Sequence, residues 1–230
     1  IVKGDSATSA GLKLIPFMIG IVTMSIVSGK LITKHGHYKR FPIMGLALMT
    51  IGLAMLATLT ETTAFWKLAI YAILIGAGLG LSMQTIVIAL QNSVEFRDLG
   101  VATSANTFFR SIGATMGVAL FGTVYASRLA HNLPIEIEKL RASNPAALVG
   151  ATPEKFVALK ENTAVLKTFT PELQVGIINA FVNSFHIVFL TAVPITVIGF
   201  FIAFMLRETP LRTGVGHQAA KEEAAGEALA

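Results

Sequence analysis

Arg110 and His186 are the two ionisable side chains that lie deep within long apolar stretches, so chemistry would be sought there first. A charged group in such surroundings normally faces a cavity, a counter-charge or backbone carbonyls. An imidazole titrates near neutrality, so His186 could join a proton path. Both could equally be structural, with Arg110 bonded to carbonyls of neighbouring helices and His186 packed on a helix face. No Asp or Glu lies in the middle of these stretches, so an acidic partner for Arg110 must come from outside this sequence.

Amide and small side chains recur on common faces when the apolar stretches are read as helices. Small residues let helix backbones approach, and amides avoid lipid, so these faces should point at protein or water. Both helix packing and a polar transport path fit the pattern. The three faces are Gly76, Gly80, Gln84 and Gln91; Asn106, Arg110, Gly113 and Gly117; and Asn179, Asn183 and His186.

Enzymatic and metal chemistry find little support. His35 and His37 could suggest a metal pair, but they lie among four cationic side chains without a third ligand nearby, and the chain has no Cys. A membrane-embedded enzyme would need a paired nucleophile and base or clustered ligands. Arg110 is neither base nor nucleophile, and His186 is the only ionisable group in its stretch. We therefore predict no metal site, no cofactor and no catalytic residues.

The elements that position these residues are long apolar runs. Apolar residues make up 53% of the 230 residues and charged residues only 13%, with a mean hydropathy of +0.69. These values exclude an ordinary soluble domain. A helix needs about 20 mostly apolar residues to cross the hydrocarbon core. We predict an all-α integral membrane protein with five spans, at about Ser9–Ser28, Phe41–Leu59, Trp66–Leu90, Val101–Tyr125 and Ile177–Leu206.

Details of these spans follow from the same rules. If the fourth span begins near Gly100, Arg110 lies about 15 Å deep, close to the bilayer midplane. Pro16 and Pro194 should kink the first and last spans. Trp66 stands where an interfacial anchor belongs. The formal charge of +5 does not indicate nucleic-acid binding, because the basic residues cluster in one turn and near span ends.

The basic turn at residues 29–40 predicts the orientation. It holds four Lys/Arg and no acid between two spans, so it should be cytoplasmic. By alternation, residues 126–175 form an external loop with short helices, and residues 207–230 form a cytoplasmic tail that is partly disordered. Within the loop, Thr152-Pro153-Glu154 should open a helix to about Lys167, and Thr170-Pro171-Glu172 should open the last span.

The basic turn also resembles a signature of the major facilitator superfamily, G-x-L-x-x-[RK]-x-G-x-x-[RK]-[RK]. The matching residues are Gly29, Leu31, Lys34, Gly36, Lys39 and Arg40. Thr33 stands where the fullest form of the motif has Asp, so a charge relay through that position is not expected. Three glycine-containing segments and a closing Glu-Thr-Pro are similar to the fourteen-span drug:proton antiporter branch: residues 76–94, 100–113, 117–122 and 208–212.

This resemblance implies that the chain is the carboxy-terminal part of a longer transporter. Gln84 and Gln91 would lie on a cavity-lining helix. Arg110 and the glycine series Gly113, Gly117 and Gly122 would lie where the two half-bundles meet, with Asn106 on the same helix. The last helix is peripheral in that fold, which argues against transport through His186.

The implied activity is export of small amphipathic molecules in exchange for protons across the inner membrane, with the carboxy terminus cytoplasmic. The implied partners are the lipid bilayer, the missing amino-terminal half, the substrate, protons and a possible periplasmic adaptor. Two other classes stay open: a non-transporting membrane sensor or scaffold on a transporter fold, and a transporter of another solute class.

Overall fold

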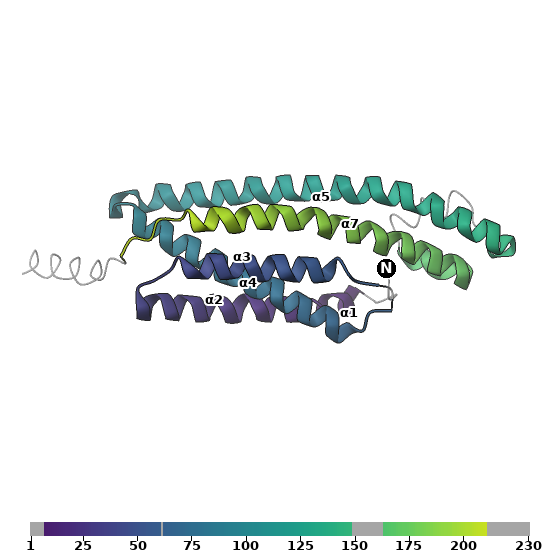
Figure 1. Ribbon diagram of the computed structural model, residues 1–230, viewed down its shortest axis with the longest axis horizontal. Coiled ribbons are helices and arrows are strands. Elements are labelled where there is room, and N and C mark those ends of the chain that lie inside the picture. The colour runs from purple at the N-terminus through teal and green to yellow at the C-terminus, as the bar shows by residue number, and fades with distance from the viewer. Residues whose placement is uncertain (1–6, 61, 149–162, 211–230) are drawn as a thin grey trace, which may run out of the picture.

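The computed structural model describes residues 7–60, 62–148 and 163–210, and every regular element in these ranges is helical. Figure 1 shows them as a bundle of long helices with short links. The α-helices are α1 (Ala7–Leu12), α2 (Ile15–His35), α3 (Arg40–Leu56), α4 (Phe65–Ser93), α5 (Leu99–Ser143) and α7 (Pro171–Phe204). Three 3₁₀ turns accompany them: η1 (Phe96–Asp98), η2 (Pro145–Leu148) and η3 (Thr163–Thr168).

The predicted all-α membrane fold is confirmed. Helices α2, α4, α5 and α7 are long and apolar enough to cross a membrane, and α3 is a shorter apolar helix of 17 residues. Most of the large apolar side chains on their outer surfaces are exposed, as expected for helices that face lipid. The chain is therefore a multi-pass membrane protein.

The first predicted span is two helices rather than one kinked helix. The α1 helix ends at Leu12, and α2 begins at Ile15 with Pro16 in its first turn. Proline has no N–H and clashes with the carbonyl four residues earlier, so it is tolerated in a first turn but not in a helix interior. Pro194, by contrast, lies inside the continuous α7.

The basic turn is shorter than predicted. Residues 29–35 belong to the last turns of α2, and the link to α3 is only residues 36–39. Gly36 ends α2 with a φ of +73°, and its N–H donates to the Ile32 carbonyl at 2.8 Å. Glycine adopts this left-handed conformation without a steric penalty, which allows α3 to turn back at once.

Helix α4 packs through glycines against α2 on one face and α3 on another. Gly76 and Gly80 lie directly against the backbone of α2 at Phe17 and Ile21, and Gly78 lies against Gly45 of α3. A methyl group at any of these positions would collide with backbone atoms. The close approach of the three helices therefore depends on small residues.

The α5 helix does not end at Tyr125, where the predicted span ends, but continues through Pro134 to Ser143. The first part of the predicted loop is thus helical. Its residues Leu129, Leu133, Ile137 and Leu140 recur at helical spacing and pack against a buried cluster from α7 and η3. The buried members of that cluster are Leu166, Phe169, Leu173, Ile177 and Phe181.

As a result, α5 and α7 form a hairpin that projects beyond the other helices (Figure 1). Thr50 of α3 donates to Thr196 of α7 at 3.0 Å. Because the two helices are antiparallel, the end of α3 at Leu56 lies level with about residue 190 of α7. The remaining residues of α7, back to Pro171, extend about 28 Å further at 1.5 Å per residue.

The two cap signals have different outcomes. Thr152-Pro153-Glu154 lies outside the described residues. The α7 helix begins at Pro171, as the second signal predicts, with Glu172 in its first turn. The Thr170 hydroxyl, however, does not cap the helix: it donates to the Ala147 carbonyl at 2.5 Å and ties η2 to α7.

Candidate translocation site

Arg110 lies on the membrane part of α5 and is exposed. It follows Leu99 by eleven residues, so it lies about 16 Å from the start of the helix. If the span begins at Leu99, this is the depth predicted from the sequence, near the middle of a hydrocarbon layer of about 30 Å. In the described part of the chain it forms no ion pair or hydrogen bond. A charge at this depth needs a partner or water, and the described residues supply no protein partner.

A row of hydroxyls adjoins Arg110. Each hydroxyl donates to the carbonyl four residues earlier: Thr107 to Thr103 at 3.0 Å, Ser111 to Thr107 at 2.9 Å and Thr115 to Ser111 at 3.0 Å. Arg110 follows Thr107 by three residues, so it adjoins this row on the helix surface. Sequence reasoning missed the row, although its spacing of four was a visible signal.

The polar face of α5 has an apolar counterpart. Phe108, Phe109, Ile112 and Met116 are all exposed. At about 100° per residue, Phe109 and Met116 lie opposite the hydroxyl row, and Phe108 and Ile112 lie between the two. The apolar face of α5 is suited to contact with lipid, and the face with Asn106 and Arg110 is suited to contact with protein or water.

The glycines of α5 face no described helix. An added Cβ at Gly113 or Gly122 would meet nothing within 4 Å, and at Gly117 it would reach only the ring of Phe121 at 4.0 Å. The glycines that do pack closely are on α2, α3 and α4. A packing role for Gly113, Gly117 and Gly122 thus stays a prediction about a surface that the described residues do not cover.

Gln84 and Gln91 are exposed on α4. Neither forms a hydrogen bond with Arg110 or Asn106 in the described ranges, and α4 contacts α5 far less than it contacts α2 or α3. The small residues that share their face, Gly76 and Gly80, pack on α2.

His186 is half-buried on α7 and lies far from Arg110. The ring of its neighbour Phe185 stacks on Tyr125 of α5, with centroids 4.7 Å apart. Tyr125 follows Arg110 by fifteen residues, which separates the levels of His186 and Arg110 by about 20 Å along the hairpin. The structure does not bring the two ionisable groups together.

The motif residues occupy one end of the bundle, here called the basic end. Gly29, Leu31 and Lys34 lie on α2, Gly36 is its C-cap, and Lys39 and Arg40 open α3. Lys34, Lys39 and Arg40 form no ion pair with a described acid. Thr33 donates to the Gly29 carbonyl at 2.9 Å, so the residue at the motif's acidic position bonds only its own helix.

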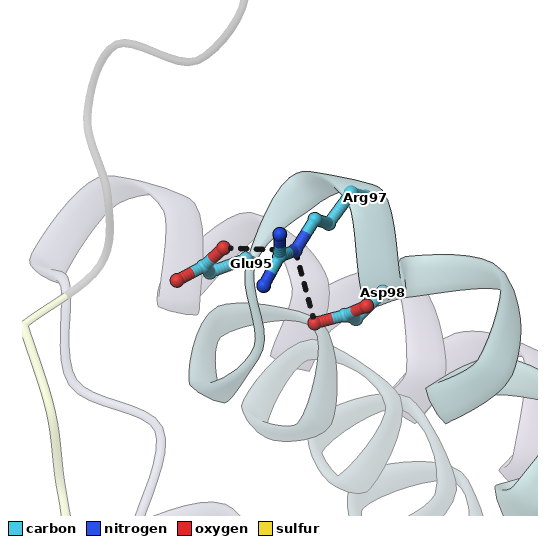
Figure 2. Close-up of polar contacts among 3 residues, drawn as sticks. All are labelled: Glu95, Arg97 and Asp98. Carbon is cyan, nitrogen blue, oxygen red and sulfur yellow. Dashed lines mark ion pairs between the residues drawn. The ribbon is translucent and has the colours of Figure 1, made fainter.

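The link from α4 to α5 also lies at the basic end. Figure 2 shows the guanidinium of Arg97 between two carboxylates, with Nε 3.2 Å from Glu95 and 3.7 Å from Asp98. All three side chains are largely exposed, so these pairs contribute little stability. Arg97 also borders an open hollow of about 810 Å³ on α5, whose other walls include Val101, Phe108 and Phe109.

The sequence of this chain is similar to those of known membrane transporters. A sequence model of the Major Facilitator Superfamily matches residues 2–129. The chain is 39% identical over 210 residues to an uncharacterized MFS-type transporter of Mycobacterium tuberculosis, covering 91% of this chain and 29% of that protein. It thus spans less than a third of the length of this relative.

Two further relatives carry more specific names. The chain is 32% identical over 240 residues to a tetracycline resistance determinant of Streptomyces rimosus, covering 98% of this chain and 69% of that protein. It is 28% identical over 242 residues to the multidrug transporter protein MdtP of Bacillus subtilis, covering 99% and 44%. Since the family match spans the basic turn, the glycine-packed α2–α4 unit and the membrane part of α5, the chain belongs to the major facilitator superfamily.

Proposed function

We propose that this chain is the carboxy-terminal part of a proton-coupled exporter of drugs or other amphipathic small molecules. The observation that carries the proposal is the uncovered polar face of α5, with Arg110 at mid-depth beside the hydroxyl row and Asn106. A polar face at membrane depth needs protein or water opposite it. The names of two relatives, a tetracycline resistance determinant and a multidrug transporter, support drugs as the class of solute.

The amino-terminal half of the full-length protein would cover this face. Gly113, Gly117 and Gly122 would let a helix of that half approach α5 closely, and Arg110 would line the junction. Gln84 and Gln91 would line the cavity from α4. Alternating access would then rock the two half-bundles about the polar face.

We propose that the protein lies in the inner membrane of the cell. In the proposed orientation, the basic end faces the cytoplasm. The four Lys/Arg of the basic turn favour it, as does Arg207 just after the last span. The α5–α7 projection would then lie outside, where a periplasmic adaptor could reach it.

In this scheme, Arg110 acts through its charge. A cation at the midplane favours the charged form of a nearby carboxylate, or repels a cationic substrate until a proton arrives. Lys keeps the charge but loses the planar fork, and Gln keeps hydrogen bonding but loses the charge.

The test is efflux by the full-length protein in vesicles with an imposed pH gradient, counted per correctly inserted molecule, with tetracycline and a lipophilic cationic dye as probes. We expect Arg110→Gln to lose at least about tenfold of the specific activity, with Arg110→Lys intermediate. The matched control is Arg128→Gln, which removes an exposed Arg from the projecting part of α5. Unchanged specific activity of Arg110→Gln refutes a role of the Arg110 charge in transport. If the unaltered protein shows no gradient-driven efflux, the result favours the alternative of a non-transporting sensor or scaffold.

A further inference from the structure

The chain that leaves α7 is bonded back onto the bundle at the basic end. Tyr38 lies in the short link between α2 and α3, among Gly, His and Lys residues, yet its side chain is only 2% exposed. Its hydroxyl donates to the Arg207 carbonyl at 3.2 Å and accepts from the Thr209 N–H at 3.0 Å. Its own backbone N–H donates to Glu208 Oε1 at 3.0 Å.

A second anchor comes from α4. The Asn92 amide Nδ2 lies 3.0 Å from Thr209 Oγ1, 3.3 Å from the Thr209 carbonyl and 3.1 Å from the Pro210 carbonyl. Thr209 is therefore hydrogen-bonded to two elements that precede it by more than 110 residues: its N–H donates to Tyr38, and its carbonyl accepts from Asn92. Beneath these bonds lies a buried cluster of Ile32, Tyr38 and Ala89, with Leu206 packed against it.

The hydrogen bonds of Tyr38 and Asn92 lie at the basic end of α7, where they can fix the tilt of the α5–α7 hairpin relative to the α2–α4 unit. Helix α5 packs mainly against α7, and α7 reaches the α2–α4 unit mainly through α3. The far end of α7 projects beyond that unit. Over the 34 residues of α7, about 51 Å, a tilt of about 5° at the basic end would move the far end by about 4 Å.

We propose that Tyr38, Asn92 and the segment Glu208–Pro210 form a strap that fastens the basic end of α7 to the α2–α4 unit. The strap makes the five membrane helices move as one block and fixes the direction of the projecting hairpin. Tyr38 and Asn92 are positioning residues in this device. The proposal does not depend on which solute, if any, the full-length protein carries.

The strap can be tested by electron–electron double resonance on the full-length protein. Spin labels at positions 66 and 175, both exposed, would join the start of α4 to the far end of α7. Tyr38→Phe keeps the ring in the buried cluster and removes only the hydroxyl bonds. We expect the distribution of the distance between the two labels in Tyr38→Phe to shift or broaden by about 4 Å. This is the displacement of the far end of α7 estimated above for a tilt of about 5°.

Tyr71→Phe is the matched control, because the Tyr71 hydroxyl of α4 forms no hydrogen bond with a described residue, and it should leave the distribution unchanged. Thr209→Val provides a second variant in case Tyr38→Phe does not fold, since it removes one hydroxyl from a partly exposed position. Unchanged distributions in the folded strap variants overturn the proposal, whatever those variants transport.

Discussion

A single methyl group at Gly20 should push α2 and α4 apart. A Cβ built on Gly20 would lie 2.6 Å from the Ile73 carbonyl oxygen and 2.9 Å from the Ala77 backbone nitrogen. Real Cβ atoms essentially never approach closer than 3.0 Å, so the helices must separate locally by at least 0.4 Å, the difference between 3.0 and 2.6 Å. Both obstacles are backbone atoms, which cannot rotate away. Overpacking of this kind costs about 1–3 kcal/mol of stability.

Gly199→Ala in α7 separates this effect from helix propensity. A Cβ there would lie 3.5 Å from Leu46 of α3, an ordinary van der Waals distance. Both substitutions gain about 1 kcal/mol from the better helix propensity of Ala. We therefore expect Gly199→Ala to be neutral or stabilising and Gly20→Ala to be less stable than it by about 1–3 kcal/mol.

The assay is thermal inactivation of the detergent-solubilised full-length protein, followed by fluorescence-detected size exclusion. Gly20→Ala should lose its monodisperse peak at a lower temperature than the unaltered protein, and Gly199→Ala at the same or a higher one. Equal melting of the two variants would refute the argument that backbone contact at Gly20 sets the spacing of α2 and α4.

Two further predictions concern orientation and the glycines of α5. An impermeant thiol reagent outside intact cells should label a Cys at position 144 but not at position 37, both of which are exposed; the reverse pattern would invert the proposed orientation. Gly113→Leu and Gly117→Leu should impair transport by the full-length protein more than Ala119→Leu at matched expression, because a tight helix interface resists added volume. Equal activity of all three variants would remove the glycines from the proposed junction.

The class of the fold was readable from the sequence because it depends on a property of each segment alone. A run of about 20 apolar residues can satisfy its backbone only as a helix in lipid, whatever its neighbours are. The start of α7 at Pro171 was readable for the same reason, since a proline in a first turn is a local signal.

The continuation of α5 beyond Tyr125 was missed because mean hydropathy was used to find its end. After Tyr125 the sequence becomes too polar for a span, but Leu129, Leu133, Ile137 and Leu140 still mark one helix face. That face is stable only because α7 and η3 cover it. A helix that leaves the bilayer is recognised by its periodicity rather than by its mean hydropathy.

The strap and the packing glycines depend on long-range contacts, which no local pattern encodes. Tyr38 in its basic link looks like a surface residue, and its partners follow about 170 residues later. Glycine series occur on both α4 and α5, yet only that of α4 has a described neighbour. Spacing identifies a face that could pack, and only the neighbouring helix determines whether it does.

The projecting hairpin would also help in imaging the full-length protein. A small transporter embedded in a micelle offers few features for aligning particle images, because most of its mass lies within the detergent belt. Here α5 and α7 continue without interruption from the membrane region into the projection. The direction of the projection outside the detergent belt therefore shows the orientation of the two helices inside it. A rigid helical protein spliced in phase onto α5 near Ser143 would act as a fiducial marker that reports the tilt of the carboxy-terminal helices directly.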